Sequence, residues 1–431
     1  WGWMKQITLE TDIQNIEPAH QLDGSDLLSH LRARFHIPKY SSDKPYIYFS
    51  GNSLGLQPDT AEKYVKEELD AWNKLGVDGH LNANRPWLPY HEFLTSYSAE
   101  IVGALDKEVV VMNSLTVNLH LLMVSFYRPK GKRKKILIEK HAFPSDRYAV
   151  QSQLKFHGND PNDDLIVCNA DKGEFISMND IMNYLEKHGE EIALVLLGGV
   201  NYYTGQAFDM AAITDKAQSS GCRVGFDLAH AAGNIKLNLH DWGIDFAAWC
   251  GYKYLNGGPG APSGVFIHER HLGRTDYPRF EGWWGHDKTT RFDMPDEFMP
   301  LQTVEAWQLS NPPILSMAAL LASLEIFHEA GMSQLRQKSE KLTSYLESLI
   351  ISELSGQIKI ITLPSPQSRG CQLSLRLLQP VDEITKLLHD RGVISDWREP
   401  DVIRVAPVPL YNSFEDCYAF VQILKSILNE G

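Results

Sequence analysis

The chain has few of the sequence features that are typical of secreted, membrane-bound or zinc-stabilised proteins. Its 431 residues include five cysteines, and no two of them form a CxxC pair. An odd number of isolated thiols is typical of a reducing compartment and predicts neither a disulfide framework nor a cysteine-based zinc site. No run approaches the roughly 18 apolar residues of a membrane span, and the N-terminus lacks the basic-then-apolar order of a signal peptide. We therefore expect a cytoplasmic protein that does not enter a membrane.

Positive charge is also scarce. Lys and Arg number 41 against 54 Asp and Glu, which gives a formal charge of −13. Nucleic acids and anionic membrane surfaces are bound by clustered basic side chains, so neither is an expected partner. The one dense basic run, residues 130–135, lies between Pro129 and an apolar stretch and is predicted to be a solvated turn.

Length and composition predict more than one hydrophobic core. Hydrophobic residues make up 43% and charged residues 22% of the chain, as in ordinary packed proteins, and a chain this long usually divides into domains. The run Asn311-Pro312-Pro313 breaks the pattern before a long apolar helix. We expect a large domain over residues 46–312, a smaller C-terminal α+β domain over 313–431 that begins with a bridging helix, and an N-terminal segment, 1–45, packed on the small domain.

Short apolar runs alternate with helical patterns in the middle of the chain. Continuous apolar strands separated by helices indicate an α/β domain whose mostly parallel sheet is covered on both faces. Such sheets bind ligands at the C-terminal ends of their strands. The expected strands are residues 135–139, 192–197, 223–227, 246–250 and 264–268, with helices at 177–188 and 210–220. In the C-terminal part we expect helices at 314–330 and on to about 351, a strand at 371–378, a helix at 381–390, strands at 392–396 and 402–405, and a helix at 413–428.

One lysine and one aspartate indicate the chemistry. Asp227 ends an expected strand, and Lys253 follows in an aromatic context beside the turn Gly257-Gly258-Pro259-Gly260. An amine that forms a Schiff base, paired with a carboxylate that protonates a pyridine nitrogen, is what an enzyme of pyridoxal 5'-phosphate (PLP) needs. Each residue alone has a commoner explanation, Asp227 as a helix cap and Lys253 as a surface lysine. The glycine turn lacks GxGxxG spacing, so a dinucleotide fold is not indicated.

Other residues could complete such a site. Thr116 precedes the apolar helical run 119–126, where helix amides could hold a phosphate or simply be capped. Phe143 could cover a flat cofactor, or be a core aromatic, and His230 could orient the ring. Arg404 lies in an apolar strand and needs a carboxylate partner, either a structural acid or a substrate.

Two short motifs suggest other chemistry. Residues 51–55 read G-x-S-x-G, which would make Ser53 the nucleophile of a serine hydrolase, but no helix follows directly and a nearby triad is not evident. His268 and His271 form H-x-x-H rather than the zinc pair of H-E-x-x-H, so no metal is predicted.

Taken together, these segments resemble the kynureninase family, a member of the fold-type I, PLP-dependent transferase-like enzymes of the aminotransferase class V group. The similarity runs in order along nearly the whole chain. The matching stretches are FSGNSLGLQP (49–58), MNSLTVNLHLLM (112–123), AFPSDRYA (142–149), VGFDLAHAAGN (224–234), GYKYLNGG (251–258), GWWGH (282–286), LSNPPIL (309–315) and VIRVAPVPLYNSF (402–414).

The resemblance implies a PLP site shared between two copies of the chain. Lys253 would be the Schiff-base lysine, Asp227 the pyridinium partner and Phe143 the stacking ring. Trp283 and Asn311 match positions that complete the site from a neighbouring subunit, which implies a homodimer. Many relatives have Ser where this chain has Gly198, so a hydroxyl contact is missing there or is replaced by water or Thr204. The other implied cofactor-shell residues are Leu115, Thr116, Pro144, Ser145, Asp146, His230 and Tyr252.

The resemblance also implies the reaction: PLP-dependent hydrolysis of L-kynurenine or 3-hydroxy-L-kynurenine to an anthranilate and L-alanine, in tryptophan degradation or NAD biosynthesis. Arg404 would hold the α-carboxylate and Lys253 would act as base, with Tyr252 relaying protons. The residues implied at the aromatic end are Ser53, His80, Ser310 and Asn311. Of these, Ser310 and Asn311 with His80 resemble members of the family that favour the 3-hydroxy substrate. A class V aminotransferase or cysteine desulfurase is the alternative, although Cys371 begins an apolar strand and is a poor desulfurase nucleophile.

Overall fold

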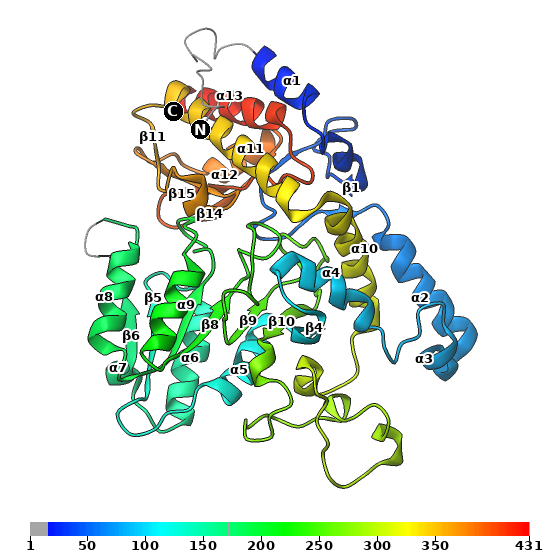
Figure 1. Ribbon diagram of the computed structural model, residues 1–431. Helices are drawn as coiled ribbons and strands as arrows, with labels where there is room; N and C mark the ends of the chain where they lie inside the picture. The colour runs from blue at the N-terminus through cyan, green and yellow to red at the C-terminus, as the bar shows by residue number, and fades with distance from the viewer. Residues whose placement is uncertain (1–15, 171–172, 431) are drawn as a thin grey trace.

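The computed structural model describes residues 16–170 and 173–430 (Figure 1). Its centre is a seven-stranded sheet in the order β4-β10-β9-β8-β7-β5-β6. β10 is antiparallel to β4 and β9, and the pairs from β9 to β6 are parallel, so the prediction of a mostly parallel sheet is confirmed. The strands are β4 (Val109–Met112), β5 (Lys135–Glu139), β6 (Leu165–Cys168), β7 (Ile192–Gly198), β8 (Arg223–Asp227), β9 (Phe246–Trp249) and β10 (Ser263–Ile267).

Helices cover both faces of this sheet. In β7, Leu194 and Leu196 pack in a core with α5 (Leu115–Phe126) and α6 (Pro144–Phe156), whereas Val195 and Leu197 pack with α8 (Met178–His188), α9 (Met210–Ser219) and α10 (Ile314–Ala330). Alternate side chains of a strand point to opposite faces, and both faces are apolar here, so the strand sequences read as unbroken apolar runs.

One helix boundary differs from the sequence expectation. α5 begins at Leu115, four residues before the predicted 119, after Ser114 in an extended conformation. Thr116 and Asn118 interrupt the apolar pattern of the first turn, which hid it from the periodicity argument. Thr116 therefore lies in the first turn of the helix rather than in the loop before it.

The C-terminal elements form a second layer, at the top of Figure 1. A four-stranded sheet has the order β11-β12-β15-β14 and packs against α11 and α13. The segment predicted as one strand, 392–396, is two: β13 pairs with β2 near the N-terminus, and β14 pairs with β15. The elements are α11 (Met332–Glu353), β11 (Ile358–Ile360), β12 (Leu373–Leu377), α12 (Ile384–Asp390), β13 (Val393–Ile394), β14 (Asp396–Arg398), β15 (Val402–Val405) and α13 (Phe414–Glu430).

The described N-terminal segment lies against these elements. Asp23, in α1 (Glu17–Gly24), accepts the backbone N–H of Phe414 at 2.8 Å, at the start of α13. Residues 1–15 of the predicted N-terminal segment lie outside the described part, and the two boundaries between the three predicted domains stay predictions. The remaining elements before the sheet are β1 (Phe35–His36), β2 (Ile47–Tyr48), β3 (Gln57–Pro58), α2 (Ala61–Leu75), α3 (Gly79–Asn82) and α4 (Glu92–Val102), and α7 (Pro161–Asp164) precedes β6.

Within residues 16–170 and 173–430, no single helix is long and apolar enough to cross a membrane. α10 and α11 reach that length and composition only as a pair, and the pair is bent by 82°.

Candidate active site

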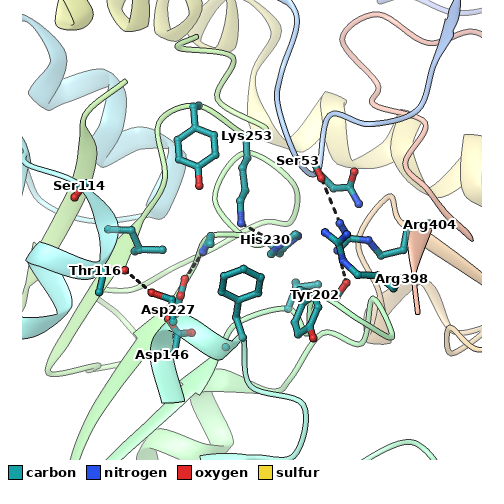
Figure 2. Close-up of a pocket in the computed structure, with 18 of the residues that line it drawn as sticks. Ser53, Ser114, Thr116, Asp146, Tyr202, Asp227, His230, Lys253, Arg398 and Arg404 are labelled. Atoms are coloured by element: carbon teal, nitrogen blue, oxygen red, sulfur yellow. Dashed lines mark hydrogen bonds between the residues drawn. The ribbon is translucent and has the colours of Figure 1, made fainter. Parts of the chain in front are cut away.

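A cavity of about 360 Å³ opens where β5, β7 and β8 end at Glu139, Gly198 and Asp227. These are C-terminal strand ends, the edge at which parallel sheets bind ligands. Figure 2 shows Lys253 in the middle of the cavity, with acids and hydroxyls to one side and two arginines to the other. The cavity brings together these residues named from the sequence: Ser53, Leu115, Thr116, Phe143, Ser145, Asp146, Gly198, Asp227, His230, Tyr252, Lys253 and Arg404.

The amine of Lys253 lies against a histidine and a phenylalanine. Its Nζ is 3.1 Å from Nε2 of His230 and 5.7 Å from the ring centroid of Phe143. Burial, followed by the charge of Lys253, lowers the pKa of His230 well below its usual value, so the imidazole is neutral at pH 7. Its Nδ1 is buried without a protein partner, a position from which it can meet a ligand.

Carboxyl groups gather below this amine. Asp227 is 6% exposed, and one of its carboxylate oxygens accepts the backbone N–H of Ala229 at 2.7 Å. Burial and the neighbouring charge of Asp227 raise the pKa of Asp146 well above its usual value. Burial also raises the pKa of Glu139 to about 7. Like charges in a dry site cannot all ionise together, so this corner holds protons at neutral pH.

Two helix N-termini face the same cavity. α5 begins beside Ser114 and α6 begins after Phe143, and the hydroxyls of Thr116 and Ser145 lie 2.7 Å apart between them. Unpaired N–H groups and the helix dipole make such ends favourable for an anion, phosphate in particular. This corner could hold a phosphate group.

The opposite end of the cavity is cationic. Arg404 is 1% exposed and donates to the backbone carbonyl of Tyr202 at 2.7 Å. It also pairs with the carboxylate of Asp396, which Ser53 contacts through its hydroxyl. Asp396 is therefore the carboxylate partner that was expected for Arg404. Ser53 lies at the same end of the cavity.

The Gly51-to-Gly55 motif is explained by close packing. Gly55 donates its N–H to the carbonyl of Tyr252 at 2.9 Å, and a Cβ at Gly55 would stand 2.4 Å from the carbonyl oxygen of Lys253. The next helix, α2, starts at Ala61. The side-chain hydrogen bonds recorded for Ser53 go to Asp396 and Arg404 rather than to a histidine, so the site does not favour a serine hydrolase.

The thiol considered as an alternative nucleophile lies outside the cavity. Cys371 is fully buried and is not among the residues lining the cavity. Burial raises its pKa to about 12, which leaves it protonated and unreactive at neutral pH. A desulfurase mechanism through Cys371 is not favoured.

The space beside Gly198 is occupied by the carboxyl group of Glu139. Its N–H donates to both oxygens of Glu139 at 3.2 and 3.3 Å, and a Cβ at Gly198 would stand 3.0 Å from one of them. Thr204, considered as a substitute hydroxyl, instead donates to Asn201 at 3.2 Å. The carboxyl group of Glu139 thus stands beside Gly198, the position at which the family resemblance implied a hydroxyl contact.

Five residues named from the sequence do not line the cavity of one chain: His80, Pro144, Trp283, Ser310 and Asn311. Pro144 begins α6, next to the cavity residues Phe143 and Ser145. His80 and Trp283 lie on other segments, where the ring of His80 contacts Trp87 and Trp283 is 41% exposed. Ser310 and Asn311 are exposed.

Sequence reasoning missed several residues that line the cavity. Arg398 and Tyr202 stand at the cationic end and Glu139 at the acidic end (Figure 2 labels the first two). Glu139 ends β5 at the ligand edge of the large sheet, and that position is a signal in the sequence that could have found it. Arg398 instead ends β14 in the C-terminal sheet, beyond the strand expected at 392–396. The others are Asn52, Ser114, Val200 and Ala229.

Comparisons with known proteins agree with this geometry. The family model described as "Kynureninase C-terminal domain" matches residues 335–424. A curated kynureninase of Myxococcus xanthus is 55% identical over 96% of this chain and 97% of its own length. One of Koribacter versatilis is 55% identical over 95% and 97%.

Solved structures show the same fold at low identity. A cysteine desulfurase of Thermococcus onnurineus superposes with a TM-score of 0.75 at 17% identity, covering 90% of this chain and 95% of that chain. The lyase C-DES, with glycine covalently linked to its PLP cofactor, gives a TM-score of 0.74 at 18% identity over 88% and 96%. The expected fold of class V PLP enzymes is thereby confirmed.

Proposed function

This chain belongs to the kynureninase family, and we propose that it is a PLP-dependent hydrolase that cleaves the Cβ–Cγ bond of L-kynurenine or 3-hydroxy-L-kynurenine. Water adds the elements of OH to the ketone carbon and H to the β-carbon, which gives anthranilate or 3-hydroxyanthranilate and L-alanine. The observation that carries the proposal is a single cavity with an amine and an acid at its centre, an anion seat at one end and Arg404 at the other. We place the reaction in tryptophan degradation or NAD biosynthesis.

The residues present fit PLP. Lys253 would hold its aldehyde carbon, and Asp227 would pair with its pyridine nitrogen. The hydroxyls of Thr116 and Ser145, 2.7 Å apart at the helix N-termini, would receive its phosphate. His230 offers a buried Nδ1 and Asp146 a buried carboxylate oxygen, and neither atom has a protein partner. Unsatisfied buried polar atoms that point into one cavity are expected where a polar ligand binds.

The bound cofactor supplies an electron sink for charge released at the substrate α- and β-carbons. Lys253, whose amine is at the centre of the cavity, would serve as the base that removes the α-proton. His230 is buried and neutral, so it can accept a hydrogen bond without adding a positive charge. Arg404 orients the substrate through its carboxylate.

Tyr252 is our candidate for moving protons in the later steps. It lines the cavity next to Lys253. Burial raises its pKa above the usual value, so the phenol stays protonated at neutral pH and can donate a proton before it accepts one.

We propose that the active enzyme is a homodimer with shared sites. His80 lies in a short stretch with the exposed apolar side chains of Val77 and Leu81, which are 78% and 68% exposed, and Trp72 on α2 is 62% exposed. Large apolar patches on a surface are typical of interfaces. A second copy that covered this surface would bring His80, Trp283, Ser310 and Asn311 toward a neighbouring cavity. We further propose a cytoplasmic location, which the five buried cysteines support because they form no disulfide.

Mixing two inactive variants tests the shared site. Lys253→Ala and His80→Ala should each be inactive alone. If His80 serves the other subunit's cavity, mixed dimers contain one intact site, and unfolding and refolding the mixture should restore about a quarter of the wild-type activity. No recovery, with mixed dimers shown to form, would refute sharing.

The reaction itself is tested by spectroscopy and product analysis. Purified protein should bind PLP and absorb visible light, and borohydride reduction followed by peptide mapping should place the label on Lys253. Added kynurenine should yield equal amounts of anthranilate and alanine. Pyruvate or sulfide as the product, or a label on another lysine, would overturn the proposal. We expect the higher kcat/KM for 3-hydroxykynurenine, since polar groups at the aromatic end can bond the hydroxyl.

A further inference from the structure

Asp396 lies between two arginines at the cationic end of the cavity (Figure 2 labels both arginines). Arg398 binds it in a fork, with its two terminal nitrogens 2.7 and 3.0 Å from the two carboxylate oxygens. Arg404 pairs with the second of these oxygens, which Ser53 also contacts. Two guanidinium groups thus share one carboxylate, which leaves one formal positive charge.

Strand register produces this arrangement. Asp396 on β14 is directly opposite Arg404 on β15 in an antiparallel pair, and opposed residues place their side chains on the same face. Arg398 is two residues along β14 and faces the same side. The three charged groups are therefore held together by backbone pairing and do not depend on a loop.

The two arginines differ in freedom. Arg404 is 1% exposed and is fixed by the carbonyl of Tyr202 at 2.7 Å. Its Nε is buried without a partner in the chain. Arg398 is 34% exposed, and its further recorded bond is to the carbonyl of Trp397. Arg404 is therefore held in a fixed position, whereas Arg398 can move with Asp396.

We propose that Asp396 occupies Arg404 in place of a substrate carboxylate, and that Arg398 is a positioning residue that retains Asp396 when the substrate arrives. The inference rests on the proposed function, in which Arg404 receives an amino-acid carboxylate. Substrate binding then exchanges one carboxylate for another on Arg404. The fork of Arg398 keeps Asp396, whose side chain is 13% exposed, from becoming an unpaired anion. An unpaired charge in such a site is costly. Arg398 therefore raises the affinity for amino acids by stabilising Asp396 after the substrate has displaced it from Arg404.

Removing the cation of Arg398 should weaken amino-acid binding. In Arg398→Gln the carboxylate of Asp396 pairs with Arg404 alone. A substrate that binds Arg404 must then displace this carboxylate and leave it without a cationic partner. KM for kynurenine should rise about tenfold or more, as for loss of one partner of a buried charge pair, while kcat stays within about twofold. Arg398→Lys keeps the positive charge but cannot form the forked pair, so its KM should lie between those of wild type and Arg398→Gln.

Removing the competing carboxylate should reverse this effect. Asp396→Asn/Arg398→Gln again leaves Arg404 as a free cation, so its KM should return to within about threefold of wild type. If the double variant binds as weakly as Arg398→Gln, Arg398 acts directly on the substrate or only on the fold, and the proposal is wrong. Arg391→Gln is the matched control: Arg391 is 33% exposed and pairs with Glu430 away from the cavity, and its KM should not change.

A binding measurement separates this proposal from the proposed reaction. L-Alanine carries the same carboxylate and α-amino group but cannot be cleaved, so its titration into each PLP-loaded variant, followed by the visible spectrum, reports the affinity of Arg404 for a carboxylate. The dissociation constants should follow the same order as KM. If kynurenine is not cleaved but the alanine series shows the rescue, the proposed function fails and the exchange at Arg404 stands. Equal alanine affinity in wild type and Arg398→Gln, with equal PLP content, would overturn the exchange.

Discussion

Replacing Glu139 by Gln should remove a pH-dependent loss of stability from the cofactor-free protein. Burial raises the pKa of Glu139 from 4.5 to about 7. A carboxyl whose pKa is higher in the folded state stabilises the fold below its unfolded pKa, and that contribution is lost as the pH rises through the folded pKa. Glu139 should therefore favour folding at pH 4.5 and oppose it at pH 8.

The size of the effect follows from the shift. A rise in pKa from 4.5 to about 7 corresponds to about 3 kcal/mol between the acidic and alkaline limits. The amide introduced by Glu139→Gln would still accept the N–H of Gly198, which donates to Glu139 at 3.2 Å in the wild type, but it cannot ionise. Relative to wild type, Glu139→Gln should thus gain about 3 kcal/mol in unfolding free energy as the pH rises from about 4.5 to about 8.5.

Urea unfolding of both proteins across this pH range, with bound cofactor first removed by dialysis against cysteine, measures the difference. Glu297→Gln serves as the control because Glu297 is exposed, and its difference from wild type should be small at every pH. A wild-type minus Glu139→Gln difference that does not change with pH would show that Glu139 ionises normally in the fold.

Three further substitutions test other parts of the structure. Burial opposes ionisation of Asp245, but hydrogen bonds from His271 and Arg270 outweigh it and lower the pKa of Asp245 from 3.8 to about 2. The ionised carboxylate stabilises the fold above pH 3.8, and this contribution is lost as the pH falls through 2. Urea unfolding should therefore show the stability difference between wild type and Asp245→Asn shrink by about 2 kcal/mol between pH 5 and 2. Tyr252→Phe should retain PLP, seen in its visible spectrum, but turn over more slowly, and unchanged turnover would reject the proton relay. Gly55→Ala places a Cβ 2.4 Å from the carbonyl oxygen of Lys253, so it should cost about 1–3 kcal/mol in unfolding free energy and lower PLP content; normal values for both would contradict the packing role of this glycine.

The sequence predicted the large sheet well because its strands are buried on both faces. The ranges of β5 and β8 match those expected, and Asp227 ends its strand at the ligand edge as the motif required. Lys253 and Asp227 could be named because each carries a local signature in the chain. The family resemblance added further residues that line the cavity, namely Leu115, Ser145, Asp146, Gly198 and Tyr252.

What the sequence did not reveal depends on register and on contacts between distant segments. The expected strand at 392–396 stopped before Arg398, so its place two residues from Asp396 on the same face was not seen. Glu139 ends a correctly predicted strand, but its contact with Gly198 joins residues far apart in the chain. His80, Trp283 and Asn311 lie outside the cavity of the single chain, and in our proposal they reach a cavity only in a second copy, which one sequence does not place.

The cavity draws its two ends from separate layers of the molecule. The acids, the lysine and the helix N-termini belong to the large sheet and its loops, whereas Arg398 and Arg404 arrive on β14 and β15 of the C-terminal sheet. In the proposed function, retention of the vitamin-derived group and selection of the amino acid would therefore be built on different cores. Mutations beneath β14 and β15 would then change which amino acids are accepted while the cofactor stays bound, an evolutionary freedom that a site made within one core would lack.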